Sequence, residues 1–260
     1  MQAGIVGNGW KEHRERMREL SAPDLSVIIP ALNERDNLEH LLPAIFEIAR
    51  AGGIRIEIIV ADGPSHDGTA EVAAQLGARV VRQQERGYGG ALLAGFAAAG
   101  APYILTMDAD LSHPPTFIKD MWARREDAEL LIASRYVPGG GATVGIMRRI
   151  LSIVLNGVFR FVLNLPIRDL SSGFRLYRRV ALGQLQVEAR DFDVQEEILV
   201  LGRNRGWRIV EIPFHYMPRK SGASHARLIQ FGAAYVRTLL KLRRLKNGRK
   251  QENLQAASLT

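Results

Sequence analysis

Two periods of hydrophobic and polar residues alternate along the first half of the chain. Short apolar runs with the length of buried strands lie at residues 25–30, 55–61, 78–82, 103–107 and 130–134. Between them, apolar residues recur every three or four positions, which predicts helices at residues 37–50, 69–76 and 91–99. Strands that alternate with helices in this way predict an α/β fold, in which a mainly parallel sheet is flanked by helices.

The pattern becomes less regular after residue 134. Residues 146–165 are strongly apolar with helical spacing, and residues 208–213 predict one late strand. The apolar stretch is interrupted by five polar or charged residues, which argue against a simple membrane span: Arg148, Arg149, Asn156, Arg160 and Asn164. The first twenty residues also lack the apolar core of a signal peptide. We therefore expect a protein that is neither secreted nor membrane-spanning.

Composition and two rejected motifs narrow the class of protein. The chain has 260 residues, of which 47% are hydrophobic and 24% charged, so it can form a large domain with a packed core. It has no cysteine, which excludes disulfides and thiolate zinc sites. Residues 4–9 resemble a dinucleotide loop, but no strand can precede them, which argues against an oxidoreductase. A nucleotidyltransferase would need a glycine-rich, basic loop where residues 30–34 are acidic.

The net charge of +8 is concentrated near the C-terminus. From Arg219 onward the chain holds ten lysines and arginines against one acid, Glu252, whereas the preceding residues are almost neutral. Residues 228–245 predict a basic amphipathic helix, which can lie on an anionic membrane surface. A terminal helix packed on the domain, with a solvated basic face, fits the same pattern. No nucleic acid is expected as a partner, because the chain has no recognisable reading module.

These features predict a cytoplasmic protein that is peripheral on the cytoplasmic face of the membrane. A membrane-protein partner or a homo-oligomer is compatible with that location.

Polar loops follow three of the predicted strands, at residues 30–34, 62–69 and 108–115. Because the carboxyl ends of parallel strands meet at one edge of a sheet, these loops are expected to share a ligand site. Asp108 and Asp110 can hold a hard divalent cation on a nucleotide diphosphate. The three loops together favour nucleotide-sugar chemistry.

Each residue of these loops also has a simpler interpretation. An isolated Asp-x-Asp fits a solvated turn, Asp67 fits a helix cap, and Glu34 fits an early helical residue that complements the helix dipole. Asp62, at the end of a strand, can accept hydrogen bonds from a nucleobase or ribose. The combination is what favours a site over these separate interpretations.

With these motifs the chain resembles the family 2 glycosyltransferases of the GT-A fold and, within them, the dolichyl- or polyprenyl-phosphate mannose synthases. The resemblance covers about residues 25–245 and extends beyond the three loops. Its later motifs are Ser134-Arg135-Tyr136, residues 169–178, Glu211-Ile-Pro213 and residues 219–224. It implies a GT-A domain at residues 23–227, between an N-terminal extension, 1–22, and a basic amphipathic helix and tail, 228–260.

The resemblance also implies roles for individual residues. The nucleotide would be bound by Pro30, Ala31, Asn33, Glu34, Asp62, Asp108 and Arg219. Mg²⁺ or Mn²⁺ would be held by Asp108 and Asp110, and the acceptor phosphate by Arg135, Arg148 and Ser152. Asp110, Arg135 and Asp169 would be the catalytic residues. Arginine suits these roles because its planar guanidinium binds phosphate oxygens bidentately and stays charged.

A lipid phosphate is already anionic near neutral pH, so it can attack the sugar without a strong base and with inversion at the anomeric carbon. A sugar hydroxyl would require a general base. Asp169 and the cluster Gln195-Glu196-Glu197 are candidates for that base. The alternative is that Glu196 and Glu197 begin a surface helix, and that Asp169 orders the acceptor loop.

The predicted function is therefore metal-dependent transfer of a sugar, with mannose from GDP-mannose favoured, to a polyprenyl phosphate at a membrane surface. A family 2 enzyme that uses a UDP-sugar, with a lipid-phosphate or hydroxyl acceptor, is the alternative. A nucleotide- or membrane-binding module is the non-enzymatic alternative. Three residues depart from the mannose-synthase pattern: Gly63 replaces an aspartate, Ser112 a glutamine and His225 a lysine.

Overall fold

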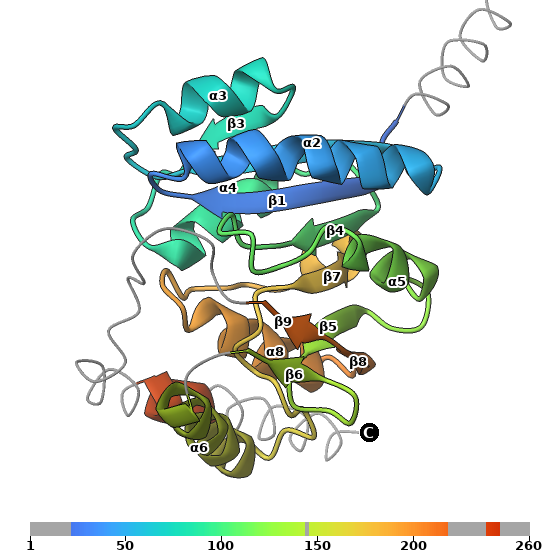
Figure 1. Cartoon of the computed structure of the whole chain (residues 1–260). Helices are drawn as coiled ribbons and strands as arrows, with labels where there is room; N and C mark the ends of the chain where they lie inside the picture. Colours follow the sequence, from blue (N-terminus) through green and yellow to red (C-terminus); the bar gives the residue numbers. More distant parts are fainter. Residues whose placement is uncertain (1–21, 144–145, 218–237, 245–260) are drawn as a thin grey trace, which may run out of the picture.

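The computed structural model describes residues 22–143, 146–217 and 238–244, and side chains within these ranges except at 146–149 and 151. A seven-stranded sheet of order β3-β2-β1-β4-β7-β5-β8 runs through the molecule (Figure 1). Its strands are β1 (Leu25–Ala31), β2 (Ile56–Asp62), β3 (Arg79–Arg82), β4 (Tyr103–Thr106), β5 (Leu130–Ser134), β7 (Arg175–Arg178) and β8 (Ile209–Pro213). A parallel pair of two-residue strands, β6 (Gly141–Ala142) and β9 (His215–Tyr216), forms a second sheet.

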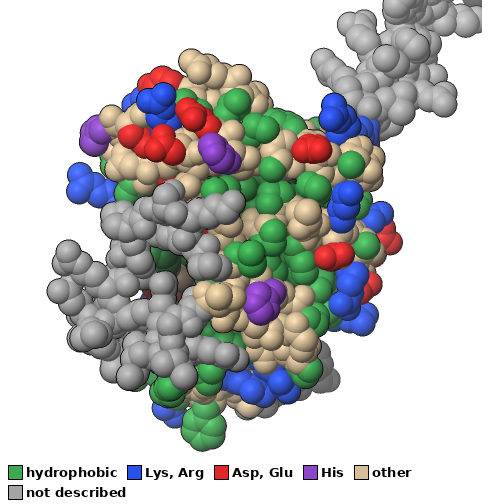
Figure 2. All heavy atoms as spheres, viewed as in Figure 1, with side chains coloured by type: hydrophobic (Ala, Val, Ile, Leu, Met, Phe, Trp, Pro, Cys, Tyr) green, Lys and Arg blue, Asp and Glu red, His purple; other side chains and the backbone are tan. Residues whose placement is uncertain are grey.

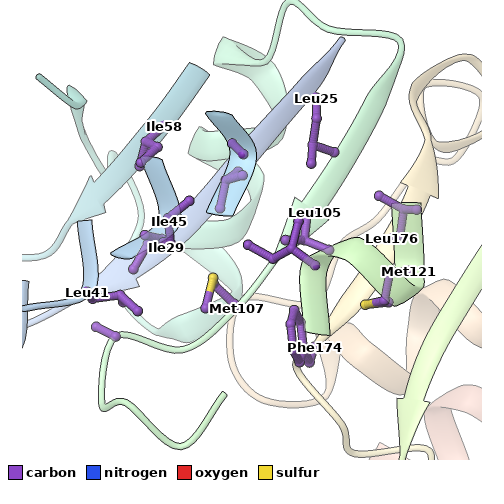
Figure 3. Close-up of a cluster of buried hydrophobic side chains, with 14 of the residues drawn as sticks. Leu25, Ile29, Leu41, Ile45, Ile58, Leu105, Met107, Met121, Phe174 and Leu176 are labelled. Carbon is purple, nitrogen blue, oxygen red and sulfur yellow. The ribbon is translucent and has the colours of Figure 1, made fainter. Parts of the chain in front are cut away.

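Helices cover both faces of the large sheet. They are α2 (Arg35–Ala51), α3 (Thr69–Gln75), α4 (Tyr88–Ala98), α5 (Phe117–Ala123), α6 (Ile146–Leu163), α7 (Arg179–Leu182) and α8 (Val194–Asn204). Leu25, Val27 and Ile29 of β1 pack in one core cluster with α2 and α5, which Figure 3 shows in close-up. Ile28 packs in the other cluster, with residues of α4, α6 and α8. Burial on both sides explains why β1 is apolar at nearly every position.

The predicted fold class is confirmed, since β1, β2, β3 and β4 are parallel neighbours and helices flank them. The predicted strands at residues 25–30, 55–61, 78–82, 103–107, 130–134 and 208–213 form with shifts of at most one residue at either end. The helix predicted at residues 91–99 begins earlier, at Tyr88. The predicted helix at residues 146–165 is α6, which ends at Leu163.

The second half holds the elements that the sequence pattern did not predict. β7 lies between β4 and β5 and is antiparallel to both. Its neighbours in space are therefore distant in sequence, and its four residues, Arg-Leu-Tyr-Arg, have no recognisable apolar run. Helix α7, and α5 in the first half, were likewise not predicted, whereas α8 matches the helix start considered for Glu196 and Glu197.

The structure describes only part of the basic amphipathic helix predicted at residues 228–245. Residues 238–244 are helical, and Leu239 and Leu242 pack against the cluster formed by α4, α6 and α8. Residues 228–237 and the predicted domain boundary at residues 227 and 228 lie outside the described residues. Among the described helices, none combines the length and the hydropathy needed to cross a bilayer.

Candidate active site

A cleft of about 420 Å³ opens where the loops after β1, β2 and β4 meet segments of the second half of the chain. Its walls include residues of the three predicted loops together with Arg135. The full set that lines it is Pro30, Ala31, Leu32, Glu34, Gly63, Gln83, Gly87, Tyr88, Ala91, Asp108, Ala109, Asp110, His113, Arg135, Ser171, Ser172, Gly173, Asp191, Phe192 and Tyr216. The position is the one expected for a ligand in a parallel α/β sheet.

The loops after β1 and β2 are joined by hydrogen bonds to each other. Asn33, with a positive φ of 55°, donates its backbone N–H to Ser65, and its side chain accepts one from His66. Asp67 accepts the N–H groups of Arg35 and Thr69, which are the first residues of α2 and α3. Asp67 thus satisfies the first backbone N–H of two helices at once, although the N-cap residues themselves are Glu34 and Gly68. Burial opposes ionisation of Asp67, but these hydrogen bonds outweigh it and lower its pKa.

Asp62 ends β2 directly beside this loop pair. Its side chain is 4% exposed, and its Oδ1 is buried without a hydrogen-bond donor among the described residues. Asp62 does not line the cleft, whereas the next residue, Gly63, does. A Cβ at position 63 would lie 3.1 Å from the side chain of Leu32, so the departure from aspartate leaves room for Leu32 at the cleft.

The loop after β4 presents two carboxylates to the cleft. Asp110 is 2% exposed, and its Oδ1 accepts hydrogen bonds from the backbone N–H and the hydroxyl of Ser112. Asp108 accepts a hydrogen bond at Oδ1 from the Tyr88 hydroxyl, at 3.3 Å. Leu111, which lies between Asp110 and Ser112, has a positive φ of 63°, which is uncommon for a leucine. The loop geometry therefore keeps both carboxylates at one end of β4.

His113 holds the loop after β4 in place through a hydrogen bond and a ring contact. Its ring stacks on Phe174 at 4.8 Å, and its Nδ1 accepts the backbone N–H of Asp108 at 3.0 Å. Burial lowers the pKa of His113, against the opposing influence of the Asp108 and Asp110 charges. An Nδ1 that accepts a hydrogen bond requires the neutral ring to carry its proton on Nε2.

The chemistry of these groups fits a divalent cation bound together with a diphosphate. Mg²⁺ and related hard cations take oxygen ligands, and sites that hold a nucleotide use one or two carboxylates with phosphate oxygens and water completing the shell. Asp108 and Asp110 supply that number of carboxylates. Among the described residues there is no group of three or more potential metal-ligating side chains, so a cation held by protein alone is not built here.

The opposite wall of the cleft is organised by Arg135 and Asp169. Nε and Nη2 of Arg135 donate to the two carboxylate oxygens of Asp169 at 2.8 and 2.7 Å. The backbone N–H of Arg135 donates to the same carboxylate, and Asp169 is completely buried. Burial would lower the pKa of Arg135, but the charge and hydrogen bonds of Asp169 outweigh it and raise the pKa. The guanidinium is therefore charged and fixed in orientation.

Further contacts fix this pair within the fold. Glu211 of β8 accepts the backbone N–H groups of Arg168 and Asp169 and the hydroxyl of Ser134. Ser152 of α6 accepts a hydrogen bond from the hydroxyl of Tyr136, the residue after Arg135, at 2.7 Å. Ser152 itself does not line the cleft.

The predicted site residues thus fall into three groups. Six line the cleft: Pro30, Ala31, Glu34, Asp108, Asp110 and Arg135. Four do not line it but lie in segments that do or that contact them: Asn33, Asp62, Ser152 and Asp169. The side chain of Arg148, and all of Arg219 and His225, lie outside the described residues.

The Gln195-Glu196-Glu197 cluster differs from its surface-helix interpretation. It does begin a helix, α8, but Glu197 is 1% exposed rather than on the surface. Burial raises the pKa of Glu196 to about 7. None of the three lines the cleft.

Sequence reasoning missed several cleft residues. The chief ones are Tyr88, His113, Asp191, Phe192 and Tyr216. Tyr88 lies in Gly87-Tyr-Gly-Gly90, a motif visible in the sequence whose place at the cleft was not foreseen. Asp191 and Phe192 come from a segment with no periodic pattern, so no local signal indicated them.

The mainly parallel sheet, with its cleft at the carboxyl ends of β1, β2 and β4, two carboxylates after β4 and an arginine opposite, fits the GT-A fold of the structural neighbours. The chain belongs to glycosyl transferase family 2, since that family matches residues 26–186, more than half of its length. It is therefore a glycosyltransferase.

Two curated relatives are similar over about three quarters of the chain. Polyprenol monophosphomannose synthase of Mycolicibacterium smegmatis is 35% identical over 213 residues, which cover 76% of this chain and 79% of that protein. Dolichol-phosphate mannosyltransferase of Pyrococcus furiosus is 34% identical over 209 residues, 77% of this chain and 58% of that one. The chain thus resembles the polyprenol-phosphate mannose synthases within the family.

Solved structures support the fold. Glucosyl-3-phosphoglycerate synthase of Mycobacterium tuberculosis, in complex with Mn²⁺, UDP and phosphoglyceric acid, superposes with a TM-score of 0.69 at 21% identity, covering 94% of this chain and 84% of that one. Mannosyl-3-phosphoglycerate synthase of Rubrobacter xylanophilus gives a TM-score of 0.66 at 20% identity, covering 90% and 78%.

Proposed function

We propose that this glycosyltransferase moves mannose from GDP-mannose to a polyprenyl phosphate, with inversion and with Mg²⁺ or Mn²⁺, at the surface of a membrane. The names of the two curated relatives support the sugar and the class of acceptor. The observation that carries the proposal is the buried pair of Arg135 and Asp169, because it bears on which acceptor the cleft can activate.

A hydroxyl acceptor would need a general base, and each candidate for it either is engaged elsewhere or does not line the cleft. Both oxygens of Asp169 bind Arg135, and Asp169 has no exposed surface. Glu197 is buried and accepts the backbone N–H groups of Glu188 and Ala189. Glu196 lies off the cleft. A phosphate monoester carries its own negative charge near neutral pH, so it needs no base of this kind.

Arg135 suits the binding of such a phosphate. Its Nε and Nη2 are committed to Asp169 and Ser171, whereas its Nη1 makes no hydrogen bond among the described residues. A guanidinium that is already oriented loses little conformational freedom when it binds an anion. Ser152, and Arg148 on the same helix, are proposed to hold the same phosphate.

On the donor side, Asp108 and Asp110 are proposed to hold the cation, which when bound neutralises charge on the departing diphosphate. Pro30, Ala31, Asn33, Glu34, Asp62 and Arg219 are proposed to bind the nucleotide. The buried Oδ1 of Asp62 is an acceptor suited to the N–H groups of a base. Asp110 and Arg135, on the two walls, would orient the donor and acceptor for in-line attack.

The surface of α6 supports the membrane part of the proposal. Ile150, Ile153, Val154, Val158 and Phe161 are between 46% and 86% exposed on this one helix. Figure 2 shows hydrophobic side chains next to basic ones at the lower end of the molecule, where Figure 1 places α6. An amphipathic helix of this kind binds in the headgroup region of a bilayer. Because Ser152 lies on the same helix, a lipid phosphate bound near Tyr136 would have its chain beside an apolar surface.

Transfer of labelled sugar from GDP- and UDP-sugars to an organic-extractable polyprenyl phosphate tests the proposal, with Mn²⁺, with Mg²⁺ and with EDTA. We expect metal-dependent lipid product from GDP-mannose. Lipid product from a UDP-sugar alone would replace the donor and keep the acceptor. If the folded chain binds nucleotide but gives no lipid product from any donor, the lipid-phosphate acceptor is wrong.

A further inference from the structure

The segment of residues 187–193, here called the strap, lies across the N-terminus of α4. The carbonyl of Arg190 accepts the backbone N–H of Gly90 at 3.1 Å. A Cβ at Gly87 would lie 2.3 Å from that carbonyl oxygen, and one at Gly89 would lie 2.6 Å from its carbon. Gly87 and Gly89 are therefore explained by contact with the strap, because only glycine lets the two backbones approach this closely, whereas a Cβ at Gly90 would meet the backbone carbonyl oxygen of Glu85 at 2.1 Å.

The strap forms part of the cleft and is connected to Asp108, a proposed metal ligand, through Tyr88. Asp191 and Phe192 line the cleft. The Phe192 ring stacks on Tyr88 with centroids 5.1 Å apart and planes 13° from parallel. The Tyr88 hydroxyl donates to Asp108, and Gln195 donates to the Tyr88 hydroxyl at 3.3 Å. The position of the strap thus sets how Tyr88 meets Asp108.

A buried carboxylate fixes the strap from behind. Glu197 of α8 accepts the N–H of Glu188 at Oε1 and that of Ala189 at Oε2, at 2.8 and 2.9 Å. The ammonium group of Lys241 donates a hydrogen bond to Oε2 of the same carboxylate at 3.2 Å. Lys241 belongs to the C-terminal helix of residues 238–244, which is anchored by Leu242, 1% exposed.

We propose that Glu197 and Lys241 are positioning residues for the donor site. They fix the strap so that Phe192 and Tyr88 orient Asp108 toward the cation of the bound nucleotide. The inference rests on the proposed function in one respect, that Asp108 binds the cation held with the donor diphosphate. Residues that orient a metal ligand in this way typically change metal affinity or activity by about 10–100-fold when they are replaced.

Two substitutions test the contact of the carboxylate with its partners. Glu197→Gln keeps the shape but presents an N–H₂ group to one of the two backbone N–H donors, and Lys241→Met removes the ammonium while keeping an unbranched chain. Lys241→Arg restores the charge and serves as the rescue variant. Arg203→Met, at an exposed position of the same helix α8, is the matched control that removes a charge away from the strap.

The measurement is calorimetric binding of GDP to the full chain, in Mn²⁺ and again in EDTA. We expect Glu197→Gln and Lys241→Met to weaken binding about tenfold in Mn²⁺ and to leave binding in EDTA unchanged. Lys241→Arg should recover most of the loss, and Arg203→Met should match the wild type. A general loss of structure would weaken binding in both conditions alike, so the ratio of the two dissociation constants isolates the positioning role.

Phe192→Leu gives a second measurement if either buried substitution prevents folding, because Phe192 is 52% exposed. It removes the stacking on Tyr88, and we expect the same selective loss in Mn²⁺. Unchanged Mn²⁺-dependent binding in the folded variants would overturn the inference. A wild-type chain that binds neither GDP nor UDP more tightly in Mn²⁺ would instead overturn the metal-dependent donor site, which is part of the proposed function.

Discussion

The two halves of the cleft use carboxylates in different ways. In the half proposed to bind the donor, built on β1, β2 and β4 and here called the donor half, Asp108 and Asp110 accept hydrogen bonds from the neutral hydroxyls of Tyr88 and Ser112. In the other half, proposed to bind the acceptor and here called the acceptor half, Asp169 binds the guanidinium of Arg135 with both oxygens. The first arrangement suits the proposed role of Asp108 and Asp110 as cation ligands. The second holds a positive group rigidly, as the proposed binding of the acceptor phosphate requires.

The carboxylates of the two halves also differ in how far apart in sequence their partners lie. Tyr88 and Asp108 are 20 residues apart, and Ser112 is two residues from Asp110. Arg135 and Asp169 are 34 residues apart, and Glu211 reaches Asp169 across 42. The acceptor half is therefore assembled only when the second half of the sheet has formed, so its ion pair should matter for stability as well as for binding.

The largest expected effect is that of Asp169→Asn. The substitution leaves the buried part of Arg135 without its counter-charge, and removing one member of a buried pair costs about 3–5 kcal/mol in the free energy of unfolding. Urea denaturation measures it. Asp127→Asn, which breaks the exposed pair with Arg124, is the control and should cost less than about 1 kcal/mol. Similar small losses for both variants would contradict the distinction drawn between the halves.

Asp110→Asn, in contrast to Asp169→Asn, should lower activity strongly while leaving stability nearly unchanged. The amide oxygen can still accept from Ser112, so the free energy of unfolding should change little. Sugar transfer should fall by about a hundredfold or more, because charge neutralisation by a bound cation is worth several kcal/mol. Steady-state transfer at saturating Mn²⁺ measures the loss. Asp120→Asn, an exposed carboxylate of α5, should retain full activity, and a full-activity Asp110→Asn enzyme would remove Asp110 from the metal site.

The difference in sequence separation between the two halves explains which parts of the site could be predicted from the sequence. Strands β1, β2 and β4 are apolar runs followed at once by polar residues, so the loops that carry Asp62, Asp108 and Asp110 were predicted from short segments alone. The motifs of the second half were recognised by resemblance, but not their contacts. The pairing of Arg135 with Asp169 depends on a loop between distant strands, which no local pattern describes.

In the second half of the chain, buried charged residues were the main reason why the sequence did not predict the structure. Arg175 begins β7 and is completely buried, with its guanidinium bound by the carbonyl oxygens of Ser172, Gln195 and Leu170. Glu197 is buried because backbone N–H groups and Lys241, 44 residues away, satisfy it. In a sequence both residues look like surface positions, since charged side chains are rarely buried without such partners.

Glu196 gives a test that depends on pH. Burial raises its pKa from 4.5 to about 7, and its Oε2 is buried without a donor among the described residues. The native state therefore binds the proton more tightly than the unfolded chain, so stability should fall as pH rises between about 4.5 and 7 and then level off. The cost at pH 8 should therefore be on the order of 2–3 kcal/mol.

Urea denaturation of the wild type and Glu196→Gln at pH 5 and pH 8 measures this effect. The two proteins should be similar at pH 5, where Glu196 is protonated in the native state, and the variant should be the more stable at pH 8. A stability difference that does not change with pH would mean that Glu196 titrates normally.

Phe161→Ser has the smallest expected effect and tests the exposed apolar surface of α6, in the acceptor half. Phe161 is 86% exposed, so its replacement should leave the free energy of unfolding nearly unchanged. If α6 lies in the headgroup region, the loss of a partly inserted phenyl ring should weaken binding to anionic vesicles by roughly fivefold to tenfold, or about 1 kcal/mol. Vesicle co-sedimentation measures it, with Val180→Ser, 73% exposed on α7, as the control. Equal binding by the two variants would detach α6 from the membrane and leave the lipid acceptor to approach from another surface.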